Sequence, residues 1–194
     1  MNGIRQFAQL FPASSRRRSR WLRCATAAAI LFIPEAVRPS DHLPSEYQVK
    51  AAYLLNFAKF IVWPAAAFET ADSPFNICIL GDDPFGATLD QLVAGETIDN
   101  RRLTLQRIKR PPSRESCQVL FVSKSEKDIP GILGTIGPGT LTVGDRDGFV
   151  REGGTIGFVI DDRRVRFDVN LRTAAKMSLQ ISARLLSVAR MVQK

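Results

Sequence analysis

The sequence predicts a single α/β domain with a mixed, mostly parallel sheet, a C-terminal β-hairpin, and flanking helices that include a long one at each end. Two observations predict this class. Short apolar runs alternate along the chain with segments in which apolar residues recur at every third or fourth position. Near the C-terminus, two further runs flank the charged residues 161–164, an arrangement typical of a hairpin. With 194 residues, 45% of them hydrophobic, the chain can bury one core.

The first helix is predicted to start at Glu46, with Ser45 as its N-cap, and to end at Trp63–Pro64. Its apolar residues form one stripe at steps of three and four, made of Val49, Tyr53, Phe57, Phe60 and Ile61. We interpret the aromatic members of this stripe as core rather than as a binding surface.

Six strands are predicted in the rest of the chain. Four are apolar or alternating runs, at 75–80, 103–108, 117–122 and 140–143. The other two, at 155–160 and 165–170, flank Asp161-Asp162-Arg163-Arg164 and form the hairpin.

Three further helices are predicted between and after these strands. Asp83 and Pro84 supply a cap and a first-turn proline for a helix that runs to about Val93. A weak helix, interrupted by proline and glycine, covers 127–136. The last helix starts after the cap Asn170, and its stripe comprises Ala174, Met177, Ile181, Leu185, Val188 and Val192.

Much of the formal net charge of +8 is concentrated near the N-terminus. Five arginines at 16–23 precede an apolar run at 25–33, which is typical of a secretory signal. That run is shorter than the roughly twenty residues of a membrane-spanning helix. We expect a signal peptide at 1–36, a flexible lead-in at 37–45 and the folded domain at 46–194. A twin-arginine signal and a basic nucleic-acid-binding arm fit the segment less well.

Removal of residues 1–36 would leave 21 basic and 18 acidic residues, so the mature chain would be nearly balanced in charge. A balanced domain gives no electrostatic reason to expect nucleic-acid binding. We also expect no transmembrane segment in it. Export would place the protein in an oxidising compartment.

The expected mature domain offers few residues for catalysis or metal binding. Its only imidazole, His42, lies in the lead-in, and two cysteines far apart lack zinc-site spacing. We therefore expect no catalytic residues, no metal and no cofactor. The segments 81–86 and 145–148 lack the spacing of phosphate and calcium loops and are interpreted as polar turns. An enzyme would have to rely on Asp82 or Asp83.

Two sets of residues remain as candidates for a structural or binding role. Cys78 and Cys117 fall in short strands, where an oxidising compartment favours a disulfide, although two buried free thiols would suit apolar surroundings equally well. Arg163, Arg164 and Arg166 gather three cations around the hairpin, which could bind an anion or an acidic partner. Solvation, or pairing with the neighbouring aspartates, is the alternative interpretation.

With these segments in place, the chain resembles the YfiR family of periplasmic proteins over about residues 47–192. The strongest matching segment is the first predicted helix, with VKAAYL at 49–54, NFAKF at 56–60 and then Trp63–Pro64. Further matches are ICILG at 77–81, DPFG at 83–86, CQVLF at 117–121, LTVGD at 141–145, Gly148-Phe149, Gly153-Gly154 with Ile156 and Phe158, and the stretch from Arg166-Phe167 to Asn170-Leu171. Their order and spacing together are specific.

The resemblance implies a regulator without catalytic activity. Family members look like periplasmic repressors that bind the periplasmic sensor part of an inner-membrane diguanylate cyclase, which lowers cyclic-di-GMP synthesis and biofilm formation. The resemblance also implies a homodimer and a disulfide between Cys78 and Cys117. A second pair found in some members has no counterpart here, because no cysteine follows Cys117. The alternatives are a periplasmic small-molecule-binding protein that feeds a sensor kinase or transporter, and an enzyme of unknown type.

Overall fold

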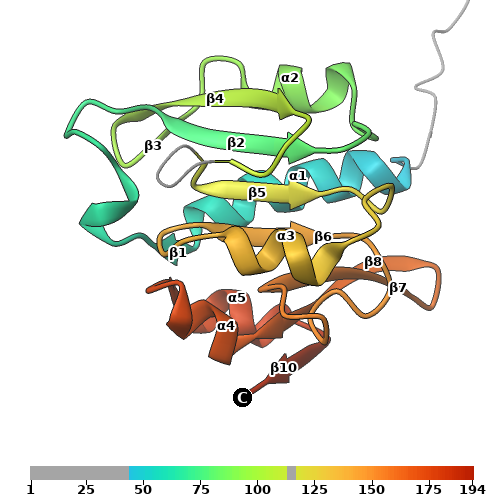
Figure 1. Ribbon diagram of the computed structural model, residues 1–194. Helices are drawn as coiled ribbons and strands as arrows, with labels where there is room; N and C mark the ends of the chain where they lie inside the picture. The colour runs from blue at the N-terminus through green and yellow to red at the C-terminus, as the bar shows by residue number, and fades with distance from the viewer. Residues whose placement is uncertain (1–43, 113–116) are drawn as a thin grey trace, which may run out of the picture. The chain divides into compact units, whose positions relative to one another are not determined.

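The computed structural model describes residues 44–112 and 117–194 (Figure 1). The expected signal peptide, most of the expected lead-in, and His42 lie outside the described residues. The described residues form one unit. No helix within the two described ranges is long and apolar enough to cross a membrane.

An eight-stranded sheet with the spatial order β10-β8-β7-β6-β5-β2-β4-β3 organises this unit. Its strands are β2 (Phe75–Leu80), β3 (Thr97–Ile98), β4 (Arg101–Ile108), β5 (Val119–Val122), β6 (Leu141–Gly144), β7 (Ile156–Asp161), β8 (Arg164–Asn170) and β10 (Met191–Gln193). Only the pairs β3–β4 and β7–β8 of this sheet are antiparallel in the described ranges. The predicted α/β class, with a mostly parallel sheet and a C-terminal hairpin, is confirmed.

Helices cover both faces of the sheet (Figure 1). They are α1 (Glu46–Lys59), the 3-10 turn η1 (Ala65–Ala67), α2 (Ala87–Val93) and α3 (Ile129–Thr135) before the hairpin, and α4 (Leu171–Lys176) and α5 (Ala183–Val188) after it. In β2, Ile77 and Ile79 belong to the core on the α1 side, whereas Cys78 and Leu80 belong to the core on the α3 side. Both faces of the central strands are therefore buried, as uninterrupted apolar runs predict.

Helix α1 begins where the sequence predicts it to begin, but it ends at Lys59 rather than at Trp63–Pro64, because Ile61 and Val62 form strand β1. The Ser45 hydroxyl accepts a hydrogen bond from the Gln48 backbone N–H at 3.3 Å, and the Gln48 side chain accepts one from the Ser45 N–H. Phe57 is fully buried and packs edge-to-face on Phe167, with ring centroids 4.9 Å apart. Tyr53 is partly buried against the same core. The assignment of this aromatic stripe to the core is confirmed.

The prediction of one long C-terminal helix is wrong. Strand β9 (Gln180–Ile181) separates α4 from α5, and it pairs with β1 (Ile61–Val62). The Ser182 side chain then caps α5 by accepting a hydrogen bond from the Leu185 N–H at 3.2 Å. The apolar spacing that predicts one long helix here belongs to two short helices and a strand. The strand forms because Ile181 pairs with Ile61, 120 residues earlier in the chain. Val188 is 52% exposed rather than part of a buried stripe.

Helix α2 begins at Ala87, later than predicted, because Asp83 forms a turn instead of capping the helix. The Asp83 carboxylate accepts hydrogen bonds from the backbone N–H groups of Phe85, at 2.7 Å, and Gly86, at 3.3 Å. Gly86 adopts a φ of 51°, which favours glycine. Arg107 of β4 fastens this turn by donating to Asp83 and Asp90, each at 2.7 Å.

Replacing Arg107 by methionine should lower stability modestly and make it less sensitive to acid. Hydrogen bonding to Arg107 lowers the pKa of Asp90 below its ordinary value of 3.8. This contribution is therefore fully present above pH 3.8 and is lost as the pH falls through the lower pKa of the folded state. Urea unfolding should show a difference between wild type and Arg107→Met at neutral pH that shrinks in acid. Arg102→Met, an exposed change outside this network, should show no such trend.

Candidate functional site

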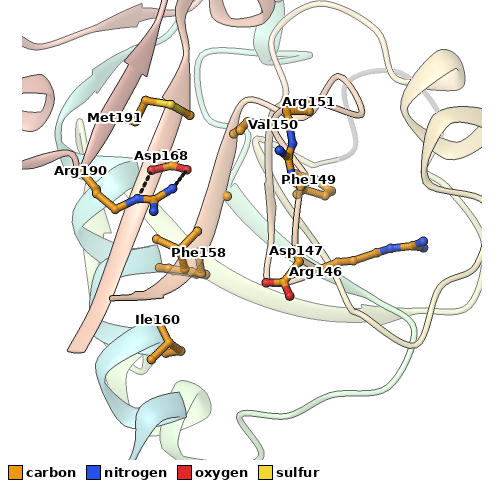
Figure 2. A pocket seen from close by; sticks show the side chains of 13 residues that line it. Arg146, Asp147, Phe149, Val150, Arg151, Phe158, Ile160, Asp168, Arg190 and Met191 are labelled. Carbon is orange, nitrogen blue, oxygen red and sulfur yellow. Dashed lines mark hydrogen bonds and ion pairs between the residues drawn. The ribbon is translucent and has the colours of Figure 1, made fainter. Parts of the chain in front are cut away.

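A groove of about 530 Å³ opens beside strand β7 (Figure 2). Its floor is one face of β7 and β8, and its walls are the segment 146–151 and the start of β10. The groove exists because β6 ends at Gly144, opposite Gly157, whereas β7 continues to Asp161. The end of β7 is thereby left without a neighbouring strand on its β6 side.

Glycines allow the wall of the groove to pack on the sheet. The Phe149 ring is buried between Gly144 and Gly154. A Cβ atom at Gly144 would lie 2.5 Å from the ring, and one at Gly154 would overlap it. At Gly157, a Cβ would lie 3.3 Å from the Val150 side chain. Any larger residue at these positions would push the wall away from the floor and change the shape of the groove.

The charges around the groove are unequally paired. Arg190 donates to both carboxylate oxygens of Asp168, at 2.8 and 2.5 Å, and these hydrogen bonds raise the pKa of the Arg190 guanidinium (Figure 2). Arg146 lies 3.8 Å from Glu152. Within the described part of the chain, Arg151 makes no ion pair. Arg151 is therefore a cation of the groove available to a ligand or partner.

The hairpin arginines of the sequence prediction occupy two places. Arg163 and Arg164 line a second groove of about 670 Å³, shared with the start of α1. Arg166 does not line it; it lies opposite Val159, a residue of the first groove, so it projects from the same sheet face at that rim. Among residues 44–112 and 117–194, none of the three arginines has an ion-pair partner, so the neighbouring aspartates do not neutralise them.

A buried polar cluster joins α1 to the turn that leads into the groove wall. Asp145 follows β6 and accepts hydrogen bonds from the Tyr47 hydroxyl at 2.8 Å and the Lys50 ammonium at 3.3 Å. Lys50 also lies 2.5 Å from Glu46 and 4.6 Å from the centre of the Tyr47 ring. The side chains of Lys50 and Asp145 are 4% and 1% exposed. Burial, reinforced by Asp145, raises the pKa of Tyr47.

Sequence reasoning missed this cluster. The sequence predicts only a polar turn at 145–148, and Lys50 is not a member of the predicted apolar stripe of the first helix. The two residues are 95 positions apart, so their pairing depends on where α1 crosses the sheet. The matches to the YfiR family at 49–54 and 141–145 were the one hint that both segments matter.

The other candidate groups have structural partners or remain apart. Asp83 is bound to Arg107, and the Asp82 N–H donates to the Ser125 hydroxyl at 3.0 Å. In the parts of the chain that the structure describes, no group of three or more histidine, cysteine, aspartate or glutamate side chains is placed to hold a metal ion. Cys78 and Cys117 form a disulfide, with Cα atoms 5.8 Å apart, in the core on the α3 side, which also contains Phe149 of the groove wall.

The fold and its two grooves define an α/β domain suited to binding. A family model described as YfiR/HmsC-like matches residues 47–190, and the chain belongs to this family. The family comprises periplasmic regulatory domains and suggests a regulator of diguanylate cyclase. A comparison with curated proteins finds no significant match.

Proposed function

We propose that this protein is a non-catalytic periplasmic repressor of an inner-membrane diguanylate cyclase. It binds the periplasmic sensor part of the cyclase, which lowers cyclic-di-GMP signalling and biofilm formation. The observation that carries the proposal is the family match over residues 47–190. The grooves support it, because they combine unpaired arginines with exposed apolar side chains, as protein-binding surfaces do.

Repression of this kind requires only a difference in affinity between two states of the partner. A protein that binds the inactive arrangement of the sensor more tightly than the active one shifts the population towards inactivity. A shift from mostly active to mostly inactive needs a preference on the order of 10⁴-fold, or about 5.5 kcal/mol. An interface with a few well-placed arginines and apolar anchors can supply that difference.

The same proposal covers the location and assembly of the protein. A signal peptide at 1–36 would export it to the periplasm, where the Cys78–Cys117 disulfide would be kept oxidised. A homodimer, as the resemblance to the family implies, would present two copies of each groove to the cyclase. Mass measurement of the mature protein would check both the cleavage position and the oligomeric state.

Charge reversal at Arg151 tests the proposal at the groove. The cyclase sensor domain should bind Arg151→Glu about tenfold more weakly than wild type, because an unpaired interface arginine is replaced by a repelling charge. A strain with the gene deleted should accumulate cyclic-di-GMP, and wild type should restore the low level whereas Arg151→Glu should restore it only in part. Arg102→Glu, an equal charge change on β4 at the opposite end of the sheet, is the matched control and should behave as wild type. Unchanged cyclic-di-GMP after deletion would refute the repressor function.

Groove volume favours one second candidate, a periplasmic small-molecule-binding protein that feeds a sensor kinase or transporter. Volumes of about 530 and 670 Å³ fall in the range of small-molecule sites. Native mass spectrometry of protein purified from its own periplasm separates the two functions. A stoichiometric small molecule bound to the protein, with no cyclase retained, would support the receptor.

A further inference from the structure

The strand edge that faces the first groove is open beyond Gly157. Strand β6 pairs with β7 only at Ile156 and Gly157, and β7 then continues for four residues, 158–161. Along that stretch, β8 is the only paired neighbour within the described ranges. An open edge of this kind presents backbone donors and acceptors to a partner.

The register identifies which backbone groups point into the groove. The turn residues Asp162 and Arg163 have φ values of 46° and 59°, the conformation of a two-residue hairpin turn. Such a turn makes Asp161 and Arg164 a hydrogen-bonded pair of the ladder. Because hydrogen-bonded and non-hydrogen-bonded pairs alternate, the backbone N–H and C=O of Val159 point towards β8, and those of Ile160 point away from it.

Two observed hydrogen bonds agree with this alternation. The Asn170 N–H donates to the Thr155 carbonyl at 2.8 Å, so the backbone of Thr155 faces β8, as that of Val159 does four residues later. The Arg190 N–H donates to the Phe167 carbonyl at 2.8 Å, so Phe167 faces away from β7, towards β10. The N–H and C=O of Ile160 therefore face the side of the absent strand. In residues 44–112 and 117–194, neither group makes a hydrogen bond outside the ladder.

The side chains around this edge favour a partner with apolar and acidic residues. Ile160 is 54% exposed and lines both grooves. The acids Asp168 and Glu152 are engaged by arginines. In the described part of the chain, one groove-lining acid, Asp147, has no ion-pair partner, and neither do the two cations Arg151 and Arg166. A second copy of this edge would bring Arg151 and Arg166 towards their own equivalents, which like-charge repulsion disfavours.

We propose that the open edge of β7 at Ile160 binds an extended, acidic segment of a partner protein as an additional strand of the sheet. The inference rests on the proposed function in one respect, namely that the partner is a protein. Backbone hydrogen bonds to Ile160 supply affinity, and alternate side chains of the added strand supply specificity. Its acidic residues pair with Arg151 and Arg166 on one face of the sheet, and its apolar residues contact Ile160 on the other.

The test uses a synthetic probe rather than the cyclase. An N-acetylated, C-amidated octapeptide of alternating glutamate and valine is titrated into the protein, and a lysine–valine octapeptide serves as the charge-reversed control. The acidic peptide should bind at least about tenfold more tightly than the basic one. Amide hydrogen exchange, followed by NMR, should slow at Ile160 when the acidic peptide is bound.

Two substitutions separate the backbone from the side chain. Ile160→Pro removes the outward N–H without removing a bond to β8, and it should weaken binding of the acidic peptide about five- to tenfold relative to Ile160→Ala, which keeps that N–H. Equal affinity for the two peptides, or unchanged exchange at Ile160 in wild type on saturation, would overturn the inference even if the proline variant failed to fold. Binding of the cyclase sensor domain is measured separately, so failure of the repressor function is recognised on its own.

Discussion

Replacing Lys50 by methionine should lower the free energy of unfolding by about 3–5 kcal/mol, because it leaves the buried carboxylate of Asp145 without its cation. The Asp145 side chain is 1% exposed and, within the described residues, would keep only the Tyr47 hydroxyl and the Lys124 backbone N–H as hydrogen-bond donors. Methionine matches the length and apolar stem of lysine, so lost packing contributes little. The measurement is urea unfolding at neutral pH, with circular dichroism as the readout.

Two further variants show whether an unpaired buried charge is the cause. In Lys50→Met/Asp145→Leu, no charge is left unpaired, and a substantial part of the lost stability should return. Lys59→Met breaks the exposed ion pair with Glu96, whose side chains are 41% and 42% exposed, and should cost less than about 1 kcal/mol. Equal losses for Lys50→Met and Lys59→Met would refute the assignment of Lys50 to a buried, stabilising role.

The buried cluster of Tyr47, Lys50 and Asp145 also connects the stability of the domain to the position of the groove wall. Asp145 directly precedes Arg146, which begins the groove wall. Its hydrogen bonds to Tyr47 and Lys50 fix the turn against α1, and Phe149 then fixes the wall against Gly144 and Gly154. A variant that releases Asp145 should therefore weaken partner binding as well as folding, although Asp145 itself does not line the groove.

The sequence predicted those parts of the fold that local pattern determines. Continuous apolar runs identified β2 and β5, because strands buried on both faces carry few polar residues. The charged turn identified the β7–β8 hairpin. The prediction for the C-terminal region is wrong because Ile181 pairs with Ile61 as a strand, although the local spacing of apolar residues is typical of a helix.

The candidate site was less predictable than the fold, for a physical reason. The sequence points to Arg163 and Arg164 because charge at a hairpin is visible in it; both residues line the second groove, and a binding role for them stays a prediction. The first groove depends on the end of β6 at Gly144 and on the packing of Phe149, and neither follows from hydrophobic periodicity. The open backbone at Ile160 depends on register, which only the pairing of strands reveals.

Reduction of the Cys78–Cys117 disulfide should lower the free energy of unfolding by about 4 kcal/mol, the chain-entropy value for a loop of this length. The cysteines are 39 positions apart, and β2 and β5 are already neighbours in the sheet, so the bond acts chiefly by restricting the unfolded chain. Comparing oxidised with reduced wild type keeps both sulfur atoms in place and avoids the cavity that a substitution would leave. A free-thiol assay on denatured, non-reduced protein should find no thiol from this pair.

Because both cysteines are buried, the rate of reduction distinguishes a structural disulfide from a regulatory one. Cys78 and Cys117 are 0% and 2% exposed, so a thiol reductant reaches the bond only when the surrounding core opens. The rate of reduction should therefore rise with urea in step with unfolding, and the Lys50→Met variant should be reduced faster than wild type. Reduction that is fast in the native state and insensitive to both changes would show instead that a local opening exposes the bond, as a redox switch requires.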